Sequence, residues 1–230
     1  MSDEQEPRRG RRRASPLAVL GIVLLVTGVG ALGAATWEFY GTTVLAQRAA
    51  EREVEAIRQQ WQASPAEADP DAGEAPLVAP PTPGEAAWLL RIPRLGDDYE
   101  KPIVAGIGSD DLKRGVGWYP ESALPGEVGN LALAGHRISR GEPFRHILEL
   151  DVGDQIVIET QGAIFTYEIN SAPREVTVQD TDSWVLLPVP GQPDVPPHQA
   201  VITLTTGQDF IRSSDRSVGF GILINTEIKQ

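Results

Sequence analysis

Short segments in which apolar and polar residues alternate fill the chain after residue 86, and they constrain its fold more than any other feature of the sequence. A period of two is typical of strands that have one face in a core and one face in solvent. The 23 Gly and 19 Pro residues supply turns between such segments. The pattern predicts strands at Ala87–Ile92, Pro102–Ile107, Asn130–Ala134, Gln155–Thr160, Ile164–Asn170, Ala200–Thr206 and Val218–Asn225.

Helical periodicity is scarce in the same region. Only Pro143–Leu150 predicts a helix, and a turn cluster at 151–154 follows it. Gln161 and Gly162, between two predicted strands, indicate a tight hairpin turn. Many short strands with little helix predict an all-β domain at 86–230, which the pattern alone leaves open as a closed barrel or a sandwich.

The first part of the chain has a different composition. A basic tail at 1–13 precedes an uncharged stretch at 14–37, whose length exceeds the roughly 20 residues that a membrane span needs. We therefore predict a transmembrane anchor at 14–37, with the arginine-rich N-terminus in the cytoplasm and the all-β domain outside the cell. The alternative is a cleaved signal peptide, although its apolar region is usually only about 7–15 residues long.

Two polar segments separate this stretch from the all-β domain. Residues 38–62 carry charged side chains three or four positions apart and predict a helical stalk in solvent. They lack the sustained apolar heptad of a coiled coil, so the sequence leaves the oligomeric state open. Residues 63–85 are rich in Pro, Ala, Asp and Glu, which predicts a semi-extended linker whose acidic groups serve solvation.

Composition excludes several classes of function. The chain has no cysteine, which rules out disulfides, thiolate metal sites and a cysteine nucleophile. A formal net charge of −12 argues against nucleic-acid binding, which needs a basic face. Three His residues, without Cys, give no metal-site pattern, and no nucleotide or dinucleotide motif occurs. We therefore predict neither a metal nor a cofactor.

Two features of the all-β domain carry chemistry. His136 follows the apolar segment 131–135 and lies where a general acid or base can reach a cleft, although an ordinary residue at a strand end is the alternative. The second feature is the segment 202–206, which ends at Gly207 and is followed nine residues later by Arg216. Each feature is weak when it is taken alone.

Together these blocks resemble the two signature regions of sortases. The first is 134–137 followed by 141–144, and the second is 203–206 followed by Arg216. The stretches 118–130 and 188–193 resemble the actinobacterial class E branch in particular. The resemblance implies a closed eight-stranded β-barrel with few short helices, preceded by a transmembrane helix and a linker. It also implies a transpeptidase, in which a cysteine cleaves a sorting-signal peptide and passes the acyl group to a cell-wall amine.

Carried over by position, the resemblance assigns roles to single residues. His136 matches the catalytic histidine, and Arg216 matches the arginine that stabilises substrate and oxyanion. Gly207 stands where the nucleophilic cysteine belongs, and a glycine cannot form a thioester. Thr205, Thr206 and Arg140 fall in the substrate-binding region of the family, although class E members often carry an aromatic residue at the position of Arg140.

Hydroxyl groups are the remaining candidates for a nucleophile. Thr205 shares the face of position 207 but lies one pleat away, whereas Thr206 points to the opposite face. Ser213 and Ser214 precede Arg216 and lie in a loop. A hydroxyl is a much weaker nucleophile than a thiol, and no Asp or Glu is evidently placed to orient His136, so we expect no replacement.

Three functions follow from this sequence. The favoured one is a cell-surface sortase-like protein that lacks transpeptidase activity and binds sorting-signal peptides or a partner in a residual groove. The second is a class E sortase whose sequence carries glycine in place of cysteine. The third is a structural envelope domain with no working groove.

Overall fold

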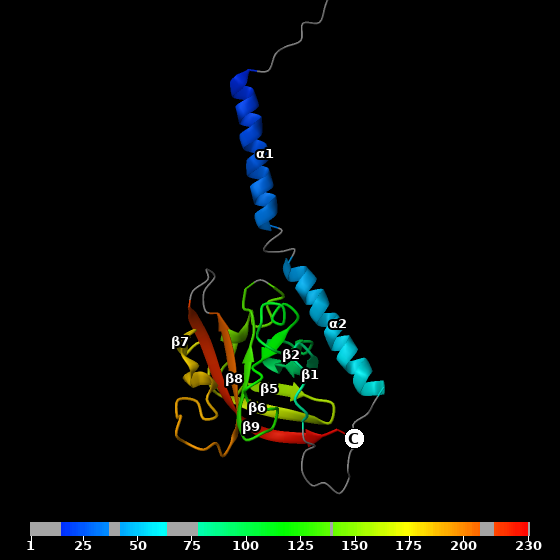
Figure 1. Cartoon of the computed structure of the whole chain (residues 1–230), viewed down its shortest axis with the longest axis vertical. Helices are drawn as coiled ribbons and strands as arrows, with labels where there is room; N and C mark the ends of the chain where they lie inside the picture. Colours follow the sequence, from blue (N-terminus) through cyan, green and yellow to red (C-terminus); the bar gives the residue numbers. More distant parts are fainter. Residues whose placement is uncertain (1–14, 37–41, 64–77, 139, 208–213, 230) are drawn as a thin grey trace, which may run out of the picture. The chain divides into compact units, whose positions relative to one another are not determined.

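The structure, a computed structural model, describes residues 15–36, 42–63, 78–138, 140–207 and 214–229 (Figure 1). The predicted basic tail, most of the predicted linker and Ser213 lie outside these residues. The chain divides into two compact units, 1–41 and 42–230, and each is described by itself.

The first unit contains one described helix, α1, at Pro16–Thr36. Proline suits the first turn of a helix because the N–H that it lacks has no partner there. Among the described residues, no helix combines the length and the apolar content that a membrane crossing requires.

The second unit is built on one sheet of nine strands. Their order is β6-β5-β1-β2-β3-β4-β8-β9-β7, and β6 also pairs with β9, which closes a barrel of eight strands and leaves β7 beside β9. This confirms the all-β closed barrel and excludes the sandwich. The strands are β1 Ala86–Arg91, β2 Glu100–Ala105, β3 Val116–Trp118, β4 Gly129–Ala134, β5 Gln155–Glu159, β6 Ala163–Ser171, β7 Thr177–Gln179, β8 Ala200–Gly207 and β9 Asp215–Ile228.

Local differences from the predicted elements have simple causes. The strands β3 and β7 were not predicted, because three residues are too few to show a period of two. The predicted helix at Pro143–Leu150 is wrong, since only the 3-10 helix η3 at Ile147–Glu149 forms there. Its first part is a turn, in which the backbone N–H of Phe144 donates to the carbonyl oxygen of His136 at 3.0 Å. Two further 3-10 helices are η2 Pro93–Leu95 and η4 Ser183–Leu186.

Apolar side chains fill the barrel and also cover part of its outer surface. Leu131 and Leu133 of β4 meet Ile202 and Leu204 of β8 in the interior. A second cluster, formed by Val178, Val185 and Val218, lies between β9, β7 and η4. Both faces of β4 are consequently buried, which explains why its sequence is nearly all apolar.

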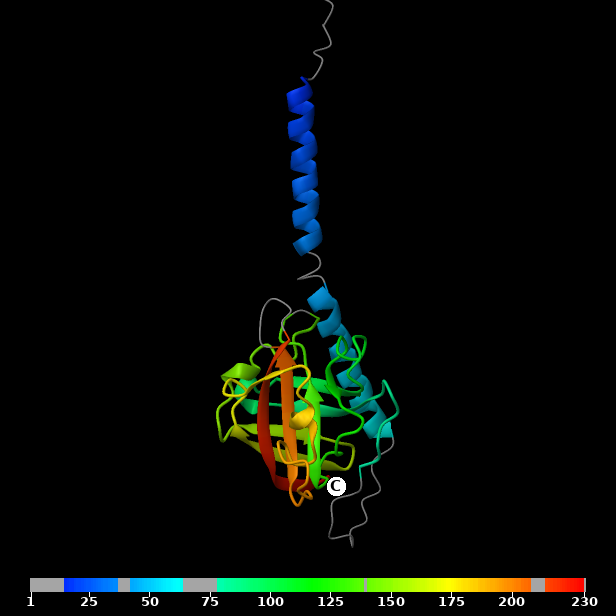
Figure 2. The same cartoon turned by 60° about the vertical axis from the view of Figure 1, so that its left-hand side comes forward.

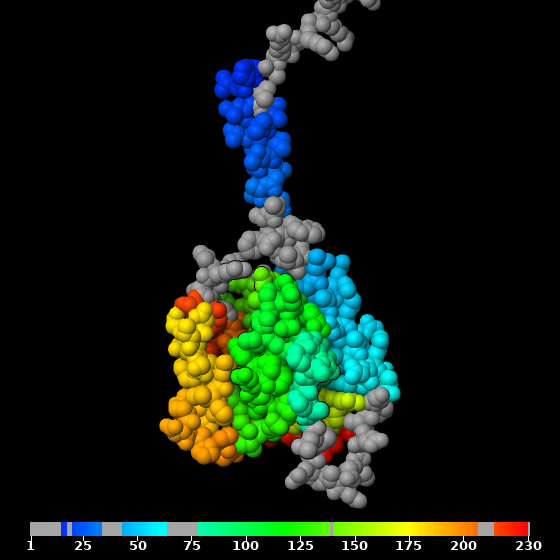
Figure 3. All heavy atoms as spheres, viewed as in Figure 1, coloured from blue at the N-terminus to red at the C-terminus, as the bar shows by residue number. Residues whose placement is uncertain are grey.

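The helix α2, Thr42–Ala63, packs against the barrel and does not form the solvated stalk that we predicted (Figure 3). Ala46 and Ile57 are buried on the barrel side. Apolar residues recur every three or four positions on this face and form an apolar stripe, although charged residues lie between them in the sequence: Ala46, Ala50, Val54, Ile57 and Trp61.

Ion pairs fix the same helix in place. Arg58 bonds the carboxylate of Glu100, and Arg114 donates from Nη2 to Glu53 Oε1 at 2.6 Å. The side chain of Glu159 in β5 is only 8% exposed, and its Oε2 lies 3.6 Å from Nη2 of Arg58 in α2. Two other cations reach the Glu159 carboxylate, Arg91 at 3.6 Å and Lys229 at 2.9 Å. Glu159 therefore joins α2, β1, β5 and the end of the chain.

Candidate functional site

Three adjacent strands bring the predicted catalytic residues to one end of the barrel. Strand β8 lies between β4, with which it runs parallel, and β9, with which it runs antiparallel (Figure 2). Ala134 pairs with Thr205, and the N–H of Gly135 donates to the carbonyl oxygen of Thr205 at 3.1 Å. Continued by two residues, this register places His136 level with Gly207. Gly207 in turn pairs with Arg216.

Strand alternation assigns these residues to the outer face of the barrel. Leu204 faces the interior, so Thr205 and position 207 face outward. Val218 is the register partner of Thr205 and belongs to the cluster outside the barrel, which confirms this direction. We call the outer surface formed by His136, Thr205, Gly207 and Arg216 the site face.

The site face is bounded by η4, which a buried polar network holds against β4 and β8. The side-chain amide of Asn130 donates to the carbonyl oxygens of Val185 at 2.9 Å and Leu187 at 3.0 Å. The Thr203 hydroxyl donates to Asn130 Oδ1 at 2.8 Å. Because buried polar groups are costly unless they are paired, this network fixes where η4 lies.

The backbone around His136 is held by close packing. A Cβ atom on Gly135 would lie 2.5 Å from Cδ2 of Phe144, so only glycine lets that ring pack where it does. Tyr99 donates its hydroxyl to the carbonyl oxygen of Pro143 and ties the same loop to the start of β2. The His136 side chain is half-buried, and its Nε2 atom is not accessible to solvent.

The predicted threonines occupy different surroundings. The Thr206 hydroxyl donates to the carbonyl oxygen of Gly135 at 2.7 Å and so links β8 to the residue before His136. Thr205 is 8% exposed and lies on the site face. Thr206 thus supports the site from inside the barrel, while Thr205 forms part of its floor.

The Arg216 guanidinium lies at the edge of the site face with 34% of the side chain exposed. Its Nη1 donates to the carbonyl oxygen of Asp215 at 3.0 Å, and its Nη2 lies 3.7 Å from Oδ2 of Asp180. Tyr119 is also near: burial raises its pKa, and the charge of Arg216 opposes that rise. Arg216 therefore has an acidic group beside it, and its charge is felt by the phenol of Tyr119.

Arg140 and Ser214 have partners away from the centre of the site face. Arg140 has a positive φ of 55° and donates from Nη1 to the hydroxyl of Ser109 at 3.1 Å. The Ser214 hydroxyl donates to Oε1 of Gln179 at 2.6 Å. The structure brings neither of them together with His136 and Gly207.

The arrangement of a His and an Arg at the ends of β4 and β9 can now be compared with known proteins. The sortase domain profile matches residues 90–223. The chain belongs to the sortase family. Sortase SrtE1 from Streptomyces coelicolor is 34% identical over 95% of this chain, and the chain spans 62% of the length of that relative.

Solved sortases share the fold. Sortase E from Streptomyces avermitilis is 34% identical, with a TM-score of 0.58 over 64% of this chain and 93% of that one. Sortase E1 from Streptomyces coelicolor, solved with a tripeptide in the active site, is 37% identical, with a TM-score of 0.56 over 64% of this chain and 92% of that one.

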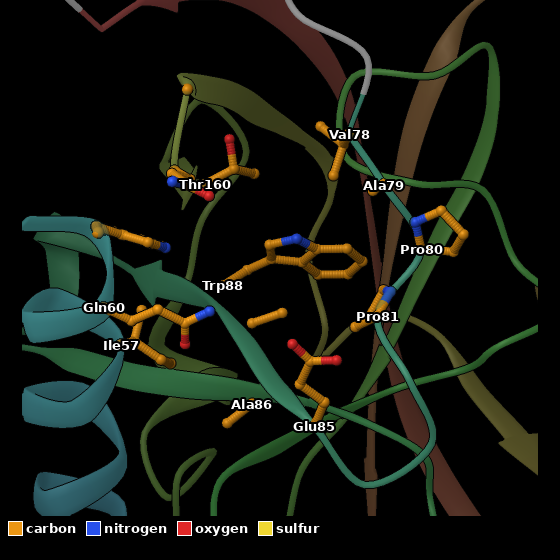
Figure 4. A pocket seen from close by; sticks show the side chains of 14 residues that line it. Ile57, Gln60, Val78, Ala79, Pro80, Pro81, Glu85, Ala86, Trp88 and Thr160 are labelled. Carbon is orange, nitrogen blue, oxygen red and sulfur yellow. The ribbon is translucent and has the colours of Figure 1, made fainter. Parts of the chain in front are cut away.

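A cavity of about 300 Å³ in this sortase lies elsewhere, between α2, residues 78–81, β1 and the turn between β5 and β6 (Figure 4). Trp61 and Trp88 are among the side chains that line it, and His136, Gly207 and Arg216 are not. Its position beneath α2 makes it a packing gap of the helix rather than part of the site face. Within the described ranges, no three His, Asp or Glu side chains gather as metal ligands do.

Sequence reasoning missed Asp180 as a member of this sortase site. Nothing in its local sequence distinguishes it from the other acidic residues of the segment 175–182. Its place beside Arg216 depends on the pairing of β7 with β9, and β7 is too short to be predicted. Tyr119 belonged to a stretch that resembles class E sortases, but the resemblance assigned it no role.

Proposed function

We propose that this sortase binds sorting-signal peptides on the site face and does not cleave them. One observation carries the proposal: the register pairs Gly207 with Arg216 and places it level with His136, and the chain contains no cysteine. The site therefore keeps an imidazole and a guanidinium around a position that has no reacting atom. Acyl transfer through a thioester requires a thiolate, which this chain cannot form.

The hydroxyl groups near Gly207 support the same proposal. Thr206 donates to the carbonyl oxygen of Gly135, and Ser214 donates to Gln179. Thr205 is on the site face but lies one residue pair, roughly 6–7 Å, back along β8. A serine or threonine nucleophile needs a base within hydrogen-bond reach, and the first two hydroxyls are directed to other acceptors.

Peptide binding needs donors and a surface, and both remain. A guanidinium carries five N–H donors in a fixed plane and can hold a peptide carbonyl group. The Streptomyces coelicolor sortase E1 was solved with a tripeptide in its active site, and the present chain is 37% identical to it over the matched region. We propose that the homologous surface here takes the same class of ligand.

Titration of the full chain with sorting-signal peptides, followed by calorimetry, tests the proposal. The wild-type protein should bind a peptide below millimolar concentration without releasing a cleaved product. The Gly207→Cys variant should cleave the peptide, and Gly207→Ala should bind but not cleave it. Cleavage by the wild-type protein that His136→Ala abolishes would contradict the proposal and implicate a hydroxyl nucleophile.

The second candidate is a class E transpeptidase whose position 207 is cysteine in its working form. The same observation favours it, because His136 and Arg216 keep positions suited to acyl transfer around that residue. Transfer of a peptide to an amine acceptor by Gly207→Cys, at rates above its hydrolysis, would support this candidate. Absence of any peptide binding would leave the third function, a structural envelope domain.

We further propose that residues 86–230 lie outside the cell, with 14–37 as an anchor of this sortase. The support is the uncharged stretch at 14–37 and the arginines that precede it in the sequence. Protease added to intact cells should then trim the barrel domain. Complete protection in intact cells, with digestion after lysis, would contradict this location.

A further inference from the structure

The short strand β7 runs alongside the end of β9 that carries Arg216. Val178 pairs with Arg216, and Gln179 pairs with Asp215. Arg216 therefore lies between two strands, with Gly207 of β8 on one side and Val178 of β7 on the other. The segment that follows β7 thus lies beside the end of β9 that carries Arg216.

Polar bonds fix that segment to β9. Gln179 donates from Nε2 to Oδ1 of Asp215 at 2.6 Å and accepts the Ser214 hydroxyl at 2.6 Å. The backbone N–H of Asp180 donates to the carbonyl oxygen of Ser214 at 2.8 Å. These three bonds settle the position of the Asp180 backbone, and the carboxylate of Asp180 then lies 3.7 Å from Nη2 of Arg216.

We propose that Asp180 is a positioning residue, which holds the Arg216 guanidinium in the direction that peptide binding requires. The proposal rests on the proposed function of the site face. An arginine side chain has many rotamers, and a partner that selects one of them removes part of the entropy cost of binding. The carbonyl oxygen of Asp215 restrains Nη1 while the Asp180 carboxylate restrains Nη2, so the plane of the guanidinium is defined at two points.

The opposite role, in which Asp180 competes with the peptide for Arg216, fits the geometry less well. A guanidinium has five N–H donors, and Asp180 and Asp215 each approach one of its terminal nitrogens. A carboxylate beside one terminal nitrogen does not by itself keep a peptide carbonyl group from the guanidinium. The distance of 3.7 Å and the half-exposed carboxylate of Asp180 also describe a pair that orients the side chain without enclosing it.

The test compares peptide affinity of the full chain among matched variants. Asp180→Asn removes the charge beside Arg216. Asp182→Asn is the control, because it removes an equal charge two residues away from Asp180. The Asp182 carboxylate accepts the N–H of Gln179 at 2.8 Å, and an asparagine oxygen can still accept that bond. Asp180→Asn should weaken binding by about two- to fivefold, the range typical of a partly exposed ion pair. Asp182→Asn should bind as the wild type does.

Two further measurements separate positioning from a general loss of structure. Asp180→Glu keeps the charge and should recover most of the affinity. In an Arg216→Ala background, Asp180→Asn should cause no additional loss, because the group that it positions is absent. Equal losses in both backgrounds, or tighter binding by Asp180→Asn, would overturn the proposal.

An NMR readout keeps this proposal distinct from the proposed function. The Nε–Hε resonance of Arg216 should show greater mobility in Asp180→Asn than in Asp182→Asn, whether or not peptide is present. If the wild-type protein binds no peptide but the mobility changes as stated, the proposed function fails and the positioning role stands. Unchanged mobility of Arg216 in Asp180→Asn would overturn the positioning role itself.

Discussion

Gly207 and Arg216 are directly opposite each other, as the last residue pair between β8 and β9. Residues that face each other on antiparallel strands direct their side chains to the same side of the sheet. Any side chain at position 207 would therefore project from the same face of the sheet as the side chain of Arg216. This pairing makes the guanidinium, rather than a nucleophile, the main chemical group of the site face.

Arg216→Ala should weaken the binding of a sorting-signal peptide by about 10- to 150-fold. The estimate follows from the roughly 1.5–3 kcal/mol that a hydrogen bond to a charged group contributes. Calorimetric titration of the full chain measures it. Arg94→Ala is a suitable control, because Arg94 pairs with Asp151 and Asp154 and is not a residue of the site face. Equal affinities for wild type and Arg216→Ala would remove the basis for peptide binding on this face.

Gly135→Ala should destabilise the fold by about 1–3 kcal/mol, the usual cost of an overpacked site. The added Cβ would lie 2.5 Å from Cδ2 of Phe144, which packs beside the backbone of His136. Urea unfolding monitored by circular dichroism measures the change. The double variant Gly135→Ala/Phe144→Leu relieves the contact and should recover part of the stability. A fully stable single variant would show that the ring can move at no cost.

Glu159→Gln should lower the free energy of unfolding by about 1–3 kcal/mol, because it leaves three cations without their shared carboxylate. Arg58, Arg91 and Lys229 are 42%, 39% and 28% exposed, so solvent compensates part of the loss. Glu55→Gln on the exposed face of α2 is the control. The deficit of Glu159→Gln should shrink in high salt, and a deficit that salt leaves unchanged would contradict an electrostatic origin.

Tyr167 should make the stability of the barrel depend on pH above about 10. Burial raises the pKa of this phenol above its ordinary value of 10.0, and its oxygen accepts the N–H of Gly126 at 2.9 Å. The unfolded chain thus loses the proton at a lower pH than the folded chain does. The contribution of Tyr167 is complete below pH 10 and declines as pH rises toward the folded-state pKa.

Tyr167→Phe should therefore be less stable at neutral pH, because Gly126 loses its acceptor. Its unfolding free energy should also fall less steeply above pH 10, by up to about 1.4 kcal/mol per pH unit. Denaturant unfolding at several pH values measures both effects. Parallel slopes for the two proteins would show that the phenol of Tyr167 ionises equally in the folded and unfolded states.

The all-β fold was predictable because most strands are five or more residues long and because strands such as β6 show a clear period of two. The packing of α2 against the barrel was not predictable from the sequence. The apolar stripe of this helix contains two alanines and lies among charged residues that form ion pairs. Whether such a stripe is buried depends on the partner surface. Here the barrel also supplies the ion-pair partners of α2, Glu100, Glu159 and Arg114, which are distant from the helix in sequence.

Some residues of the candidate site could likewise be predicted from the sequence, and others could not. His136 and Arg216 could be identified from short sequence blocks, since each block keeps its functional residue at a fixed spacing from its strand. Asp180 could not, because its position is set by β7, a strand of three residues that only tertiary contacts hold in place. The sequence also could not show that the Thr206 hydroxyl is directed to Gly135.

The packing of α2 against the barrel determines where the chain can be truncated without exposing buried surface. A fragment that begins at residue 86, where the sequence places the domain boundary, would lose Arg58 and Trp61 along with the rest of the helix. The carboxylates of Glu100 and Glu159 would then lack one of their cations, Lys229 would lose the Trp61 ring 4.1 Å from its Nζ, and the contact surface of Ile57 would be exposed to water. Such a fragment should aggregate more readily than one that begins at Thr42, the first residue of the second compact unit.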